Sequence, residues 1–160
     1  MTVDFDNGAK ETNVFRDFSD WAPWEQRKNL LDPVWNSRLA VYPGVYILAH
    51  FDKSPVGTAD YLDDAIFYVG EGGHLGRRWY QFERSALEGK SGHSGGFSYQ
   101  TKYGKQLWKK LHIAALPVWF GDRDESIEDW TQVYRLYVER RILWEITMKR
   151  NGRHGLLNNK

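Results

Sequence analysis

The chain contains no cysteine and no long apolar run, and these two absences narrow what the protein can be. Without cysteine there are no disulfides, no thiolate nucleophile and no cysteine-based zinc site. No apolar segment approaches the roughly 18 residues of a membrane-spanning helix, and the acidic start does not resemble a signal peptide. We therefore expect a cytoplasmic protein with no membrane partner.

Aromatic residues are abundant, at 16% of the 160 residues, and apolar residues make up 41%. A chain of this length and composition can bury one hydrophobic core, which indicates a globular protein. We expect an N-terminal extension over residues 1–42, packed on a domain that covers residues 43–160. Aromatic residues recur at every third position from 15 to 24 and predict a short helix, which Pro23 interrupts.

Hydrophobic periodicity predicts the elements of the domain. The expected strands cover residues 45–51, 65–70 and 113–120, and Pro117 favours an edge position for the third. The expected helices cover residues 75–88, 105–111 and 127–150, with a Gly-rich loop at 89–104. The predicted fold is α/β (α+β), a small, mainly antiparallel three-stranded sheet flanked by helices.

The stretch 66–78 combines a strand, a glycine-rich turn and the start of a helix that opens with Arg77 and Arg78. A helix N-terminus offers unpaired N–H groups and a partial positive charge, so anions bind well at such a corner. We therefore expect a phosphate-handling site. An alternative is a dinucleotide-binding turn, with Glu88 near the acidic position, but the chain lacks the required succession of βαβ units.

Residues 89–121 contain no acidic residue, and lysines alternate there with aromatic residues. This pattern predicts a nucleic-acid surface on a Gly/Lys-rich insertion at 89–111. The alternative is an ordinary solvated loop. Together with Arg77, the residues expected to bind DNA are Lys90, His93, Lys102, Lys105, Lys109 and Lys110.

The last predicted helix is apolar on more than one side, which is typical of a helix buried between layers. Ser126 and Asp129 predict its N-cap. Glu139 lies on an apolar stripe between Leu136 and Leu143. Burying a carboxylate is costly unless a metal ion or an arginine compensates it, so Glu139 is a candidate metal ligand.

Several short motifs stand in the order found in the GIY-YIG nucleases, a family that the chain resembles over roughly residues 43–159. The two name-giving motifs are Gly-Val-Tyr at 44–46 and Tyr-Val-Gly at 68–70. The family's arginine lies about ten residues beyond the second tyrosine, and Arg78 has that offset. The family's glutamate corresponds to Glu139, with Glu145 as a poorer fit, and its closing asparagine corresponds to Asn158.

The resemblance implies a metal-dependent endonuclease that hydrolyses duplex DNA, as in the restriction-type members. It implies that Tyr46 acts as general base, with a supporting hydrogen bond from Tyr68. Arg78 would bind the phosphate, Glu139 would hold Mg²⁺ (or Mn²⁺), and Asn158 would buttress the site. Cutting both strands would need a homodimer or sequential nicking. The alternative is a nucleic-acid-binding module of the same fold that has lost catalysis.

One position departs from the family pattern. The family often has a tyrosine or histidine one helical turn after the arginine, and this chain has Phe82 there. Tyr80, His74 and His93 are the residues that would take over that role.

Overall fold

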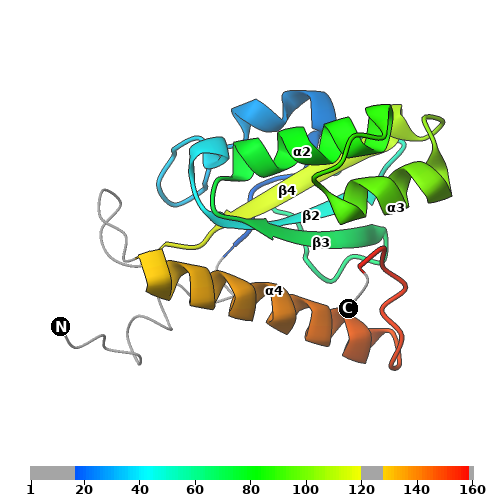
Figure 1. The fold of residues 1–160 in the computed structure, drawn as a ribbon. Helices are drawn as coiled ribbons and strands as arrows, with labels where there is room; N and C mark the ends of the chain where they lie inside the picture. Colours follow the sequence, from blue (N-terminus) through cyan, green and yellow to red (C-terminus); the bar gives the residue numbers. More distant parts are fainter. Residues whose placement is uncertain (1–16, 120–127, 159–160) are drawn as a thin grey trace.

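The fold is built on a four-stranded antiparallel sheet. The computed structural model describes residues 17–119 and 128–158 (Figure 1). In that part of the chain the strands are β1 (Ala22–Pro23), β2 (Gly44–His50), β3 (Ile66–Gly72) and β4 (Leu111–Pro117), in the spatial order β1-β4-β2-β3. The α-helices are α2 (Leu75–Glu88), α3 (Ser94–Tyr103) and α4 (Glu128–Lys149), and the 3₁₀ turns are η1 (Trp24–Asn29), η2 (Leu39–Val41) and η3 (Trp108–Lys110).

The α+β class is confirmed, but the sheet has four strands and not the expected three. The additional strand, β1, has only two residues and comes from the N-terminal extension, where Ala22 pairs with Ile113 of β4. β4 therefore lies between β1 and β2, and the edge position predicted from Pro117 is wrong. Pro117 is the last residue of β4 and lies beyond the two residues, His112 and Ile113, at which β1 pairs, so its missing N–H costs no bond to β1.

Helices cover both faces of the sheet (Figure 1). Val45, Ile47 and Ala49 of β2 belong to the core shared with α4, whereas Tyr46 and Leu48 belong to the core shared with α2 and α3. This alternation follows from the two-residue period of a strand. β3 is the edge strand of the sheet, so its outer side lies between the two helical layers.

The Gly-rich segment predicted as a loop contains α3. The side chain of His93 caps this helix, because its Nδ1 accepts a hydrogen bond from the N–H of Gly96 at 3.1 Å. A Cβ at Gly96 would lie 2.6 Å from Cβ of Ser85 on α2, so the glycine allows the two helices to approach closely. The predicted helix at 105–111 is reduced to the short turn η3.

α4 follows its prediction in extent but not in burial. Its sheet-facing side is buried at Val138, Ile142 and Ile146, whereas Tyr137 and Trp144 are more than half exposed. α4 packs on β3 and β2 while its outer side stays exposed, so burial on several sides is wrong. The predicted N-cap at Ser126 lies outside the described residues. None of the described helices is long and apolar enough to cross a bilayer.

Candidate active site

A cleft of about 240 Å³ lies along the outer edge of β3, between the helices of the two layers. The predicted catalytic residues that line it are Tyr68, Arg78, Glu139 and Asn158. They come from β3, α2, α4 and the C-terminal segment, so the fold brings them together from distant parts of the sequence. Glu71, Ser94 and Arg140 also line this cleft, and no motif singled them out.

Asn158 binds the edge of β3 as a further strand would. Its Nδ2 donates to the carbonyl oxygen of Val69 at 2.7 Å, and its Oδ1 accepts from the N–H of Val69 at 3.1 Å. The N–H of Leu157 donates to the carbonyl oxygen of Phe67. The C-terminal segment therefore satisfies backbone groups that an edge strand leaves unpaired.

Arg78 lies in the first turn of α2, where the β3–α2 turn directs it toward the cleft. Its Nη1 donates to Oε1 of Gln81 and to the carbonyl oxygen of Gly92, both at 3.1 Å. These bonds fix the guanidinium near the cleft wall. Arg78 also lines an adjoining hollow of about 260 Å³, together with the exposed Arg77.

Tyr46 lies behind Tyr68 and is fully buried. The two phenol rings are 6.1 Å apart between centroids, on the face of the sheet that α2 and α3 cover. Oη of Tyr46 is 2.8 Å from Nε2 of His93. Tyr46 is thus in contact with the site without lining the cleft.

The charge state of these groups follows from burial and from nearby charges. Burial raises the pKa of Tyr46 well above its usual value, and the Arg78 guanidinium acts in the opposite direction. Burial likewise raises the pKa of Tyr68 to about 12, and Arg78 again opposes it. Burial and Arg78 lower the pKa of His93 to about 3, so its ring is neutral at pH 7.

Glu139 and Glu145, the two glutamates that could match the family's motif, differ in position. Glu139 lines the cleft, with Nε of Arg140 3.9 Å from its Oε1. Glu145 instead hydrogen-bonds Tyr61 and lies 3.7 Å from Nε of Arg141, outside the cleft. Glu71, the other carboxylate of the cleft, is ion-paired with Arg135. Glu139 is therefore the better-placed carboxylate for a metal ion.

Of the three residues considered as replacements for Phe82, only one touches a site tyrosine within the described contacts. Tyr80 is exposed, and the guanidinium of Arg84 lies over its ring. His74 caps α2 by accepting from the N–H of Arg77. His93 packs on Phe82, at 5.2 Å between ring centroids, and reaches Tyr46.

Comparison with family models, with curated proteins and with solved structures gives no match to this chain. Roles for these residues rest on their chemistry and their placement.

The residues predicted to bind DNA do not form one surface. Arg77 lies beside the cleft, and His93 is buried within the protein rather than exposed. The remaining lysines are exposed. Lys109 and Lys110 belong to η3, which directly precedes β4, and the first residue of β4 pairs with the last residue of β2. That end of the sheet is opposite the turn that leads into α2. Nζ of Lys110 is paired there with Asp52 at 2.7 Å.

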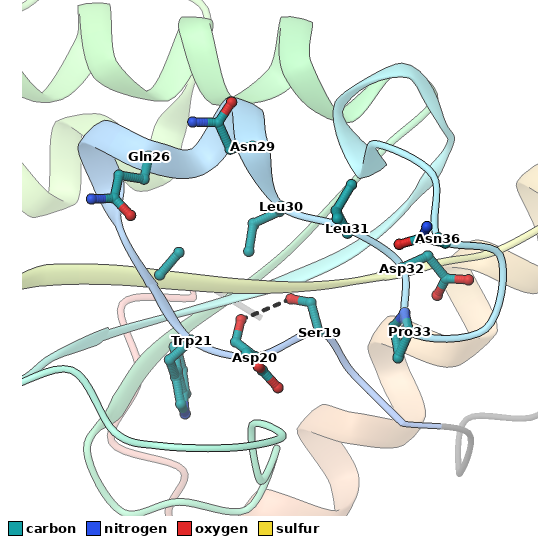
Figure 2. Close-up of a pocket in the computed structure, with 11 residues that line it drawn as sticks. Ser19, Asp20, Trp21, Gln26, Asn29, Leu30, Leu31, Asp32, Pro33 and Asn36 are labelled. Carbon is teal, nitrogen blue, oxygen red and sulfur yellow. Dashed lines mark hydrogen bonds between the residues drawn. The ribbon is translucent and has the colours of Figure 1, made fainter.

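A second hollow, of about 350 Å³, lies beside β1 (Figure 2). Its polar lining includes Asp20, Gln26, Asn29, Asp32 and Asn36, and its lining contains no arginine, lysine, histidine or tyrosine. Such a set of groups has no cation to hold a phosphate. The cleft at β3 is therefore the better candidate for the chemistry.

Proposed function

We propose that the protein is a metal-dependent endonuclease that hydrolyses phosphodiester bonds in duplex DNA, with a site of the GIY-YIG type. The observation that carries the proposal is the cleft at β3, which gathers a phenol, a guanidinium, a carboxylate and the closing asparagine. The second phenol lies directly behind the first. Phosphodiester hydrolysis needs these kinds of group at one point: a base for water, a cation for the phosphate and a site for a metal ion.

Arg78 provides the cation. Its remaining N–H groups can donate charge-assisted hydrogen bonds to the non-bridging oxygens of the phosphate. Its contacts with Gln81 and the Gly92 carbonyl hold it in place before substrate arrives. A group that is fixed in advance needs little reorganisation when negative charge develops on the phosphate.

The donor set fits Mg²⁺ (or Mn²⁺) held jointly with the substrate. Among the described residues no three histidine or carboxylate side chains come together. Of the two cleft carboxylates, Glu71 is ion-paired with Arg135, and Oε1 of Glu139 lies 3.9 Å from Nε of Arg140. Magnesium often binds through one or two carboxylates together with water and substrate phosphate. When bound, it supplies Lewis acidity and neutralises charge on the phosphate. With the ion bound, the negative charge of Glu139 would act less strongly on the two phenols than it does without the ion.

DNA would approach the cleft along the exposed Arg77, with Lys90 in the loop that precedes His93. Whether cleavage is sequence-specific, as in restriction enzymes, depends on contacts with base edges. One cleft cuts one strand at a time, so a double-strand break would require a homodimer or two successive nicks.

The test is plasmid cleavage in Mg²⁺ and in Mn²⁺, with Arg78→Ala and Glu139→Gln beside the wild type. We expect each variant to lose about 100-fold or more in rate, because each removes a group that acts on transition-state charge. Arg84→Ala and Glu145→Gln are matched controls on the same two helices, outside the cleft, and should cut like wild type. Equal loss in the controls would contradict the assignment of the cleft.

The second candidate is a DNA-binding module without catalysis, which Phe82 favours because it places a hydrocarbon where the family often has a proton-transferring side chain. In that case the wild type would retain DNA in a gel-shift assay but leave plasmid intact in every divalent cation. Defined fragments would instead point to a restriction enzyme, and diffuse nicking to a repair or nonspecific role.

A further inference from the structure

A further hollow, of about 370 Å³, lies at the end of the sheet where α4 begins. Gly44, the first residue of β2, pairs with Pro117 at the end of β4 and with Gly72 at the end of β3. Residues that follow these two strands therefore lie near each other, and Trp119 and Gly73 both line the hollow. We call it the Trp119 hollow. The first two turns of α4 complete its lining with polar side chains, which are those of Asp129, Thr131, Gln132 and Arg135.

The Trp119 hollow adjoins the cleft around the turn from β3 to α2. Gly73 lines both the Trp119 hollow and the smaller hollow that contains Arg77. Arg78 lines that smaller hollow and also the cleft. A second link is the ion pair between Arg135, which lines the Trp119 hollow, and Glu71, which lines the cleft. A nucleotide chain with one phosphate in the cleft can therefore place a neighbouring nucleotide in the Trp119 hollow.

The charges of the Trp119 hollow disfavour a phosphate in it. Arg135 is the one cation among the described residues that line it, and its guanidinium is already paired with Glu71. Asp129 adds an exposed carboxylate, which repels an anion. A neutral group that donates hydrogen bonds fits this lining better, because the carboxylate and the amide oxygen of Gln132 both accept them.

An indole and an amide in the Trp119 hollow are suited to a flat ligand. The ring of Trp119 is partly exposed and meets the ring of Tyr42 edge-on, at 5.7 Å between centroids. The N–H of Val118 donates to the carbonyl oxygen of Pro43 at 3.0 Å, which fixes the backbone that carries the indole. Gln132 is exposed, and no hydrogen bond among the described residues occupies its side-chain amide. Aromatic rings stack with any nucleobase, whereas an amide distinguishes between the edges of the bases.

We infer that the Trp119 hollow binds an adenine base next to the phosphate in the cleft, stacked on Trp119 and recognised by Gln132. The inference rests on the proposed function and adds a base contact to it. Glutamine matches adenine, because Oε1 accepts from the N6 amino group while Nε2 donates to N7. The carboxylate of Asp129 is a second acceptor for that amino group. A volume of about 370 Å³ lies at the lower end of the range for small-molecule sites, so the hollow holds one base that has left the duplex stack.

The first test needs no cleavage. Deoxynucleosides carry a base but no phosphate, so their binding reports on the Trp119 hollow and not on the cleft. We expect deoxyadenosine to shift the NMR signal of the Trp119 indole N–H, which is identified by its loss in Trp119→Phe. Deoxyribose 5-phosphate, which has no base, should leave this signal in place.

Two glutamine variants provide the matched comparison in that titration. Gln132→Ala should weaken the binding of deoxyadenosine about tenfold, because both hydrogen bonds to the base are lost. Gln106→Ala removes an exposed glutamine that precedes η3, at the opposite end of the sheet, and should bind like wild type. If no deoxynucleoside shifts the Trp119 signal up to its limit of solubility, the inference is overturned.

The second test measures base preference during cleavage of a pool of duplexes with random sequence, whose cut ends are then sequenced. We expect the wild type to enrich adenine at one position beside the cut. Glutamate accepts from N4 of cytosine but has no donor for N7 of adenine, so Gln132→Glu should change the enriched base from adenine to cytosine at that position alone. The same adenine enrichment in Gln132→Glu and Gln132→Ala would refute the role of Gln132.

The two tests separate failure of the inference from failure of the proposed function. If the wild type cuts DNA but the Trp119 signal does not move, only the base site fails. If the wild type binds deoxyadenosine as expected but cuts no DNA with any divalent cation, the proposed cleavage fails and the base site stands. Thermal unfolding of each variant, followed by circular dichroism, confirms that the compared proteins are folded.

Discussion

At the scale of single residues, two glycines decide where the phenols lie. A Cβ built on Gly70 would be 2.3 Å from Cζ of Tyr46, and one built on Gly95 would be 2.5 Å from Cε2 of Tyr68. Heavy atoms do not approach so closely in a packed interior. Neither glycine has a positive φ, so both positions need the absence of a side chain rather than unusual backbone freedom.

We therefore predict that Gly95→Ala displaces the Tyr68 ring. Overpacking of this kind costs about 1–3 kcal/mol, which should appear in the free energy of unfolding measured with urea. The cleavage rate should fall more than this loss of stability explains, because the hydroxyl moves relative to Arg78 and Glu139. Thr101→Ala is the matched control, since Thr101 is exposed on the same helix and does not line the cleft. Unaltered cleavage in Gly95→Ala would mean that the position of Tyr68 is not critical.

The sequence could identify Gly70, which belongs to a motif, but not Gly95. Glycine and serine have low helix propensity, so a segment rich in both is typical of a loop. The helix forms because its glycines allow contact with Tyr68 and with α2, and such a contact between distant residues leaves no local signal. His93 was misplaced for a related reason: it stands in a basic stretch, yet its ring caps α3 inside the protein.

At the scale of elements, the exposed edge of β3 is closed by the chain's own C-terminal segment. An open edge strand offers unpaired N–H and C=O groups to other chains. Asn158 satisfies both backbone groups of Val69 with one amide, which no other neutral side chain of its length can do. Asn158 thus contributes to the shape of the cleft by binding the edge of β3, and this contact involves no chemical step.

Asn158→Ala should therefore lower stability, by about 1–3 kcal/mol, because it leaves two partly buried backbone groups without their partner. Asn158→Asp keeps the acceptor for the N–H of Val69 and loses the donor to its carbonyl, so it should lie between alanine and wild type. Urea denaturation measures both, with Arg153→Ala as an exposed control in the same segment. Wild-type stability in Asn158→Ala would show that this edge contact is not needed.

Elements with a regular local pattern were predicted from the sequence, and those set by distant contacts were not. β2, β3, β4, α2 and α4 carry periodic apolar residues, so their existence and order followed from the sequence. β1 is two residues long and exists only because it pairs with β4. The exposed side of α4 could not be predicted either, since periodicity does not tell how many layers a helix contacts.

At the scale of the whole molecule, two pairs of the basic residues lie at opposite ends of the sheet. Arg77 and Arg78 line the hollow at the turn into α2, which adjoins the cleft. Lys109 and Lys110 lie where β4 begins, at the opposite end of the sheet. With a net charge of +1 the protein has no general attraction for DNA, so under the proposed function these local clusters would decide how DNA lies on it.

The geometry predicts that DNA engages the cluster beside the cleft. Arg77→Gln should weaken binding to a short duplex in Ca²⁺ and reduce the slope of log K against log salt concentration by about one, because one phosphate contact is lost. Lys109→Gln removes the same charge from the opposite end of the sheet and should leave the slope unchanged. Fluorescence anisotropy over a range of salt concentrations measures both variants. If Lys109→Gln reduces the slope and Arg77→Gln does not, the duplex lies across η3, and a phosphate held there would be at the wrong end of the sheet to meet Tyr68 and Arg78.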